Sequence, residues 1–237
     1  MMTPSVHSTV RHKDMYTAVQ VDELHERARE LYAQCFELQE KLIITAAKMR
    51  DKAKEHAIYG VARRLGTLRE SMRFFFDHLP PDLNEEAEIA QLAQGNANLH
   101  AFLINCSGII DNLAWLLAYH LSLDEEMDLE KNKFDIGLFN KKFRKYLPEG
   151  VAAKVDEFDD WHGHIIGHRH PTAHRIPPYV IPYIQSATTG ENDYTPRYIH
   201  AFDKSHPVPL HSQFICDLGA VVELVEALYA DIAGTYA

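Results

Sequence analysis

The 237-residue chain has few cysteines and little positive charge. Its three cysteines, Cys35, Cys106 and Cys216, are an odd number and lie within predicted helices. They indicate buried thiols in a reducing compartment and exclude a disulfide framework, so we expect a cytoplasmic protein. The net charge of −10 excludes a general nucleic-acid coat protein, because sequence-independent phosphate binding needs a basic face. Any contact with nucleic acid must therefore be local.

Several motifs of common enzyme classes are also missing. The chain has no glycine-rich phosphate loop, no dinucleotide fingerprint and no evident serine or cysteine nucleophile arrangement. The first twenty residues lack the apolar core of a signal peptide. Residues 101–120 are apolar enough to consider as a membrane span, but Asp111 near their middle costs about 2.5–3.5 kcal/mol on insertion. We therefore expect a buried helix and no membrane partner.

Apolar residues recur every three or four positions along most of the chain, which is typical of amphipathic helices. The third predicted helix is apolar nearly all round and should lie at the centre of a bundle. Pro80 and Pro81 should end the second helix. The sequence thus predicts an all-α bundle of four to five long helices, covering residues 21–55, 57–76, 97–121, 151–168 and 213–233.

The pattern changes between the fourth and fifth predicted helices. Residues 177–211 contain two β-branched and aromatic runs around a Gly-Glu-Asn-Asp turn, which predicts a small β-hairpin insertion. The charged stretch 124–135 predicts a solvated loop. We expect residues 1–20 to form a flexible segment and residues 21–237 to form a single helical domain.

The end of the fourth predicted helix is rich in histidine. Five histidines fall within thirteen residues, and residues 161–190 contain no aspartate or glutamate while Arg169 and Arg175 are present. A cationic patch on an acidic protein is typical of a focused anion site. A simpler explanation is that the carbonyl groups at a helix end attract cations. The histidines are His162, His164, His168, His170 and His174.

Within this patch, Arg169 and His174 form an Arg-x4-His pair in the sequence RHPTAH. Residues five apart on an uninterrupted helix point about 140° away from each other. Pro171 is expected to interrupt the helix and to let the two side chains converge. A guanidinium can hold a phosphate bidentately, and an imidazole can transfer a proton near neutral pH. These groups suit cleavage of RNA by its own 2′-hydroxyl without a metal.

The bundle pattern and the motif RHPTAH resemble the HEPN superfamily of helical-bundle proteins. The resemblance implies that Arg169 is the motif arginine, His170 the polar second residue and His174 the catalytic histidine. It also implies a homodimer with a composite site, metal-independent endoribonuclease activity without a cofactor, and a toxin or antiphage context with a partner antitoxin. Some members of the superfamily are inactive binding domains. A second Arg-x4-His, RFFFDH at 73–78, is better explained as a core-facing helix terminus.

Asp111 and Asn112 lie in the middle of the apolar third helix. Buried carboxylates are rarely left unpaired, because an isolated buried charge costs several kcal/mol. The stretch IIDNLAWLL resembles the helix of HEPN-like proteins in which a carboxylate orients the motif. This resemblance implies that Asp111 contacts Arg169 or His174, whereas a structural pair with another basic side chain is the alternative. Asn105, two turns before Asn112, would join the same polar seam.

Two other functions compete with the ribonuclease. His164 with His168, and His170 with His174, have the i, i+4 spacing of metal ligands, and Asp111 or Asp160 could complete a zinc or nickel site. Against a metal, Pro171 disrupts the second pair, the first pair lacks a third ligand, and arginine repels the cation. The other alternative is a catalytically silent dimer that binds RNA, a nucleotide or a partner protein.

Overall fold

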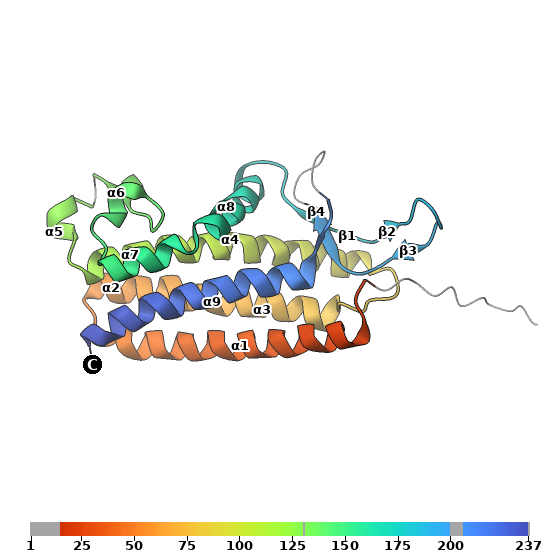
Figure 1. Ribbon diagram of the computed structural model, residues 1–237, viewed down its shortest axis with the longest axis horizontal. Coiled ribbons are helices and arrows are strands. Elements are labelled where there is room, and N and C mark those ends of the chain that lie inside the picture. The colour runs from red at the N-terminus through yellow and green to blue at the C-terminus, as the bar shows by residue number, and fades with distance from the viewer. Residues whose placement is uncertain (1–14, 130, 200–205, 237) are drawn as a thin grey trace, which may run out of the picture.

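The structure, a computed structural model, describes residues 15–129, 131–199 and 206–236. Its frame is a bundle of four long helical rods, which confirms the predicted all-α class (Figure 1). The rods are α1 (Ala18–Ala46), the continuous succession of α2 (Asp51–Glu55), η1 (His56–Ala62) and α3 (Arg63–His78), α4 (Ile89–His120), and α9 (Leu210–Thr235).

Contacts between the rods establish their directions. At the start of α1 and α9 the Tyr16 hydroxyl donates to Ser212 Oγ over 3.3 Å, and near their ends Thr45 and Tyr229 hydroxyls lie 2.9 Å apart. These two helices therefore run parallel. The Tyr32 hydroxyl donates to Glu70 over 2.8 Å and joins α1 to the antiparallel α3. The parallel helices α4 and α9 must be joined by a long crossover, which carries the remaining helices and the strands (Figure 1).

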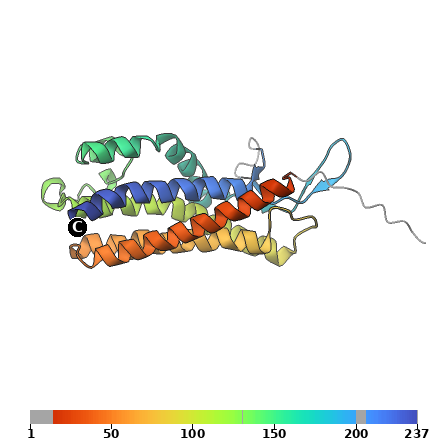
Figure 2. The ribbon, with the colours of Figure 1, turned by 60° about the horizontal axis from the view of Figure 1, so that its bottom comes forward.

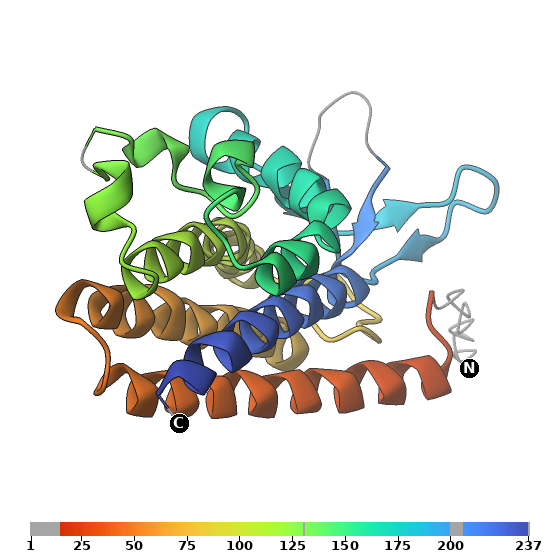
Figure 3. The ribbon, with the colours of Figure 1, turned by 60° about the vertical axis from the view of Figure 1, so that its left-hand side comes forward.

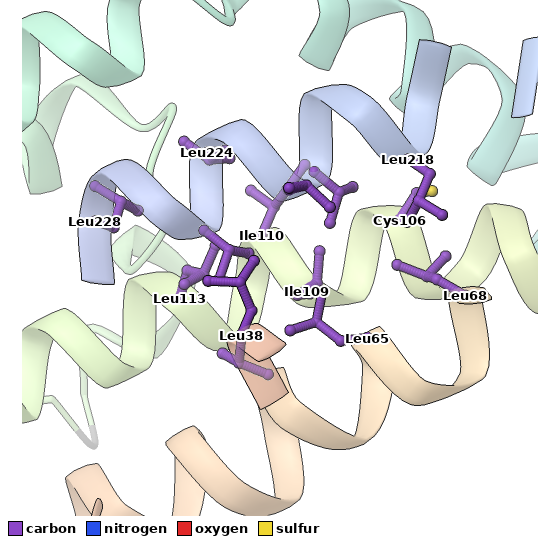
Figure 4. Packing of buried hydrophobic residues seen from close by; sticks show 14 of the residues in the cluster. Leu38, Leu65, Leu68, Cys106, Ile109, Ile110, Leu113, Leu218, Leu224 and Leu228 are labelled. Carbon is purple, nitrogen blue, oxygen red and sulfur yellow. The ribbon is translucent and has the colours of Figure 1, made fainter. Parts of the chain in front are cut away.

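The core lies between the four rods and is filled by the residues that the helical periodicity predicts. Figure 4 shows Leu38, Leu65 and Ile109 meeting between α1, α3 and α4, and Leu218 of α9 beside Cys106 of α4. By length and composition α4 could cross a membrane, but 61% of its most apolar stretch is buried inside the protein. Burial on several sides thus accounts for its apolar composition. The confirmed buried stripe of α1 is Ala28, Leu31, Cys35, Leu38, Leu42 and Ala46.

The prediction that the first helix, 21–55, extends to residue 55 is wrong. The chain leaves α1 at Ala46 and turns back into α2, although no glycine or proline marks the turn. Arg50 anchors this turn to the segment after α4, because its Nη2 lies 2.8 Å from Asp124 Oδ2 and its Nη1 donates to Ser122 Oγ over 2.8 Å. A tertiary ion pair of this kind leaves no local signal. The predicted stop before Pro80 is confirmed, since α3 ends at His78.

The crossover begins with short helices: α5 (Asp124–Met127), η2 (Lys133–Asp135) and α6 (Lys141–Arg144). The predicted helix 151–168 is two helices, α7 (Glu149–Asp156) and α8 (Asp159–His174). The expected interruption at Pro171 is wrong, because α8 continues through it to His174. Its missing N–H leaves the Gly167 carbonyl without a helical donor, but Gly167 is exposed to water.

The predicted insertion at 177–211 contains short strands at the end of the bundle where α1 begins (Figures 1 and 2). β1 (Tyr179–Ile181), β4 (Arg197–Ile199) and β5 (Val208–Pro209) form one antiparallel sheet, and β2 (Ile184–Gln185) pairs with β3 (Asn192–Asp193). Residues 200–205 of the predicted insertion lie outside the described residues. So do residues 1–14 of the predicted flexible segment, whereas residues 18–20 already belong to α1.

Candidate functional site

Helix α8, which carries the cationic motif, packs on α4 at the side of the bundle away from α1 (Figure 3). Ile165 and His168 are buried on this side of α8. His170 and His174 lie one helical turn apart and are exposed, with ring centroids 6.0 Å apart. Arg175, just past the end of the helix, is exposed as well. The C-terminal half of α8 therefore presents adjacent imidazoles and a guanidinium to solvent.

The other histidines of the cluster have separate surroundings. His162 stacks on Phe139 with a ring-centroid distance of 3.9 Å, and partial burial lowers its pKa. The rings of His164 and His168 are 4.3 Å apart, but His168 is buried and its Nδ1 lies 2.9 Å from the His164 carbonyl oxygen. The five histidines that are close in sequence thus do not share one site.

Arg169 and His174 occupy different faces of the continuous α8. Five residues on an unbroken helix correspond to about 140° of rotation, so the expected convergence through a break at Pro171 does not occur. Arg169 is half-buried and His174 is exposed. Within one chain, the structure instead places His170 beside His174 and couples Arg169 to α4.

Asp111 is the residue of α4 whose carboxyl group interacts electrostatically with Arg169. Although its side chain reaches the surface, the surrounding protein removes enough water to raise the pKa of its carboxyl group. The positive charges of Arg169 and Arg64 oppose this effect and lower the pKa. Within the described ranges no ion pair of 4.0 Å or less joins Asp111 to either arginine. The interaction between Asp111 and Arg169 is therefore one of charge without direct contact.

The sequence reasoning missed Arg64, which lies half-buried between α3 and α4. Its Nε donates to Asn112 Oδ1 over 2.9 Å and its Nη1 donates to Asn105 Oδ1 over 2.8 Å. The expected polar seam of the two asparagines thus exists, with an arginine as its shared partner. The signal was the spacing of Asn105 and Asn112 by seven residues, with Gly108 between them, in an otherwise apolar helix.

The most deeply buried carboxylate among the described residues is one that the sequence reasoning did not single out. Asp217 of α9 is 1% exposed and accepts hydrogen bonds from Trp161 Nε1 over 3.1 Å and from Gln213 Nε2 over 3.0 Å. Burial raises the pKa of this carboxyl group. Gln213 also lies 3.2 Å from His164 Nε2, so the network ties α8 to α9. Its signal was an acidic residue inside the apolar run 214–222.

The geometry does not favour the alternative metal site. Among the residues that the structure describes, no group of three or more histidine, cysteine, aspartate or glutamate side chains could hold a metal ion. The proposed ligands do not share one environment. His168 is buried, whereas His164, His170, His174 and Asp160 are exposed.

Other predicted features have mixed outcomes. Cys35 and Cys106 are buried as predicted, and burial raises the pKa of Cys35 to about 12. The expectation for Cys216 is wrong, because this thiol lies on an exposed position of α9. In the second Arg-x4-His, Phe75 and Phe76 are buried, which confirms a core-facing helix terminus.

A separate groove of about 370 Å³ lies between α1 and α3, on the opposite side of the bundle from α8. Its walls include the side chains of His25, Arg29 and Arg73 and the apolar Met72 and Phe76. Arg73 is already paired there with Glu70 and Asp77. None of the motif residues lines this groove, so it is not part of the candidate site.

Comparison of the chain with protein-family models, with curated proteins and with solved structures found no match.

Proposed function

We propose that the protein is a metal-independent endoribonuclease of the HEPN type that acts as a homodimer. The observation that carries the proposal is the exposed half of α8, where His170 and His174 lie side by side and Arg169 precedes them on a different face from His174. No aspartate or glutamate occurs from residue 161 to residue 190 to neutralise this surface. An RNA phosphodiester is the anion that such a surface can both bind and cleave.

The proposed reaction is attack of the RNA 2′-hydroxyl on the adjacent phosphorus. His174 accepts the 2′-hydroxyl proton or donates a proton to the departing 5′-oxygen. Arg169 stabilises the charge that develops on the phosphate, and His170 positions the phosphate. Asp111 orients Arg169 through its negative charge. The bond from phosphorus to the 5′-oxygen breaks, and the product carries a 2′,3′-cyclic phosphate.

The arrangement of α8 favours a site shared between two chains. Arg169 and His174 point to different faces of one continuous helix, so one chain presents them to the same phosphate poorly. If the exposed edges of two α8 helices face each other, Arg169 of one chain can meet His174 of the other. A composite site of this kind agrees with the dimer that the HEPN resemblance implies.

The resemblance also suggests the biological setting. We propose a cytoplasmic toxin or antiphage protein whose ribonuclease activity a partner antitoxin restrains. The exposed histidines of α8 are the surface that such a partner would have to cover.

A catalytically silent RNA- or nucleotide-binding dimer is the second candidate. The separation of Arg169 from His174 favours it, because a binding surface needs positive charge but no matched proton donor and acceptor. The two candidates differ in whether RNA is cut after it binds.

The test is incubation of purified protein with mixed single-stranded RNA in EDTA, followed by analysis of the fragment ends. We expect cleavage that leaves 2′,3′-cyclic phosphates and falls about 100-fold or more in Arg169→Ala and in His174→Ala. Arg73→Ala and His78→Ala are matched controls, because they have the same spacing outside α8 and should cut like the wild type.

Each contrary result points to a different function. RNA binding without cleavage would contradict the nuclease and favour the catalytically silent binding dimer. Activity that appears only when zinc or nickel is added would favour a metal site. Unchanged cleavage in both motif variants would remove α8 from the reaction.

A further inference from the structure

The half-buried Arg64 is held by neutral partners. Its two hydrogen bonds go to the amide oxygens of Asn112 and Asn105, and Asn105 in turn donates to the Ala101 carbonyl over 2.7 Å. In the part of the chain that the structure describes, no carboxylate lies within ion-pair distance of this guanidinium. A purely structural arginine is usually neutralised by a carboxylate, because removing a charge from water is costly. The two asparagines orient the Arg64 guanidinium, and its positive charge stays available to bind an anion.

The backbone around Arg64 is shaped to admit it. The guanidinium lies across Gly108 so closely that a Cβ there would be 2.4 Å from Arg64 Cζ. Gly60 likewise leaves space for Asn112, because a Cβ at position 60 would lie 2.7 Å from Asn112 Cγ. Gly60 belongs to the π-helix η1, which ends directly before α3. π-Helical turns are rare in proteins, and those that do occur often lie at functional sites.

Asp111 and Arg169 extend this seam toward α8. Asp111 follows Gly108 by three residues, which places it about 60° around α4 on the other side of Gly108 from Asn112. α8 packs on α4, and the Arg169 side chain makes no hydrogen bond or ion pair with any residue in the described ranges. Arg64 of α3 and Arg169 of α8 thus belong to helices that pack on the same helix, α4, and the positive charges of both act on Asp111. The local sum of charge is +1.

We infer that Arg64 of α3 and Arg169 of α8, together with Asp111 of α4, form a two-arginine site that binds a backbone phosphate of RNA. Arg64 is a positioning residue in this site and not a catalytic one. A guanidinium presents paired N–H donors that match two phosphate oxygens, and fixing its orientation beforehand reduces the entropy lost on binding. The identity of the ligand as RNA rests on the proposed function. The site would hold the strand beside the α8 histidines, one turn further along the same helix.

The experiment is binding of a labelled, 2′-O-methylated single-stranded RNA, which cannot be cleaved through its 2′-oxygen, measured by fluorescence anisotropy at fixed salt. We expect Arg64→Gln to weaken binding about tenfold or more, as loss of a hydrogen bond to a charged group does. Arg63→Gln is the matched control, because Arg63 is the adjacent residue, is exposed and lies over Tyr59. It should bind within about twofold of the wild type.

A second variant separates phosphate binding from structural support. Asp111→Asn removes the negative charge that interacts with both arginines, so it should tighten RNA binding severalfold, which a damaged fold would not do. Inorganic pyrophosphate should compete with the RNA in the wild type and much less in Arg64→Gln. Circular dichroism shows whether each variant keeps the helical fold.

The outcomes separate this inference from the proposed nuclease. If folded Arg64→Gln and Asp111→Asn both bind RNA like the wild type, the two-arginine site is wrong, even where cleavage occurs. If both variants change binding as expected but the wild type never cuts RNA, the site stands and the nuclease fails. If Arg64→Gln unfolds, an unchanged affinity in Asp111→Asn still overturns the site.

Discussion

His211 and Asp217 of α9 show how burial acts in opposite directions on a base and an acid. Both side chains are almost completely buried, at 0% and 1% exposed. Burial disfavours the charged form, so it lowers the pKa of His211 to about 4 and raises the pKa of Asp217. Asp217 receives two hydrogen bonds, whereas His211 packs its ring edgewise on Phe76 at 4.8 Å between centroids. Neither residue belongs to the exposed surface of α8.

The pKa of His211 predicts acid sensitivity. Above about pH 6.5 this histidine is neutral in the folded and in the unfolded protein, so it does not reduce the free energy of unfolding. As the pH falls from 6.5 toward 4, the unfolded chain takes up a proton that the folded protein does not, and the free energy of unfolding falls. The loss amounts to roughly 3 kcal/mol. We expect His211→Leu to lose correspondingly less unfolding free energy than the wild type between pH 7.5 and 4.5, measured by urea denaturation.

The control for this prediction is His170→Leu, which replaces an exposed histidine and should keep the wild-type pH dependence. Equal pH dependence in wild type and His211→Leu would show that His211 is not the source of acid sensitivity.

At the scale of elements, α8 is the helix on which the proposed function depends. It has a proline in its interior, and its polar and apolar residues are not clearly segregated. Thr172 Oγ1 donates to the His168 carbonyl over 2.9 Å, and the Arg175 N–H donates to the Pro171 carbonyl over 3.0 Å, so the last turn is hydrogen-bonded despite the proline. Tertiary packing on α4 holds the helix together where its local sequence does not.

Replacement of Pro171 tests this view of α8. Pro171→Ala restores an N–H that can donate to the Gly167 carbonyl and removes the clash of the proline ring with the preceding turn. Alanine is about 3 kcal/mol more favourable than proline inside a helix, and we expect at least about 1 kcal/mol of this as added stability. Thermal unfolding measures the effect.

Ala173→Gly, two residues further along α8, should instead lower stability by about 1 kcal/mol and serves as the matched control. A lower melting temperature for Pro171→Ala would mean that the surrounding fold requires the proline.

At the scale of the whole molecule, the proposed nuclease requires two chains. Arg169 and His174 lie on different faces of α8, so each composite site would take its arginine from one chain and its histidine from the other. The purified protein should therefore have about twice the 27.1 kDa mass of the chain, measured by light scattering. A folded, active monomer would contradict this arrangement.

Mixing two inactive variants gives a sharper test. Arg169→Ala and His174→Ala are each expected to be inactive, but a mixed dimer has one site in which both residues are intact. After subunits exchange, we expect up to about a quarter of the wild-type activity, because half of the dimers are mixed and each has one intact site. A mixture as inactive as its components, with subunit exchange shown independently, would place Arg169 and His174 in the same chain's site.

Local chemistry explains what the sequence predicted correctly about the fold. A helix buries every third or fourth residue, so the stripes of α1, α3 and α9 could be located from their apolar spacing alone. Proline after α3 and the β-branched runs of the insertion are equally local signals. The turn after Ala46 was missed because an ion pair from Arg50 to the distant Asp124 fixes it.

The helical class, the buried stripes and the cationic stretch around RHPTAH follow from the amino-acid sequence alone, because each depends on neighbouring residues along the chain. The packing of the helices, in contrast, establishes that α8 continues through Pro171, that the charge of Arg169 acts on Asp111, and that Arg64 joins Asn105 and Asn112. These features depend on which helices pack together. Contacts between residues some forty or more positions apart in the chain leave no periodic signal, and packing energy overrides the local penalty of a proline.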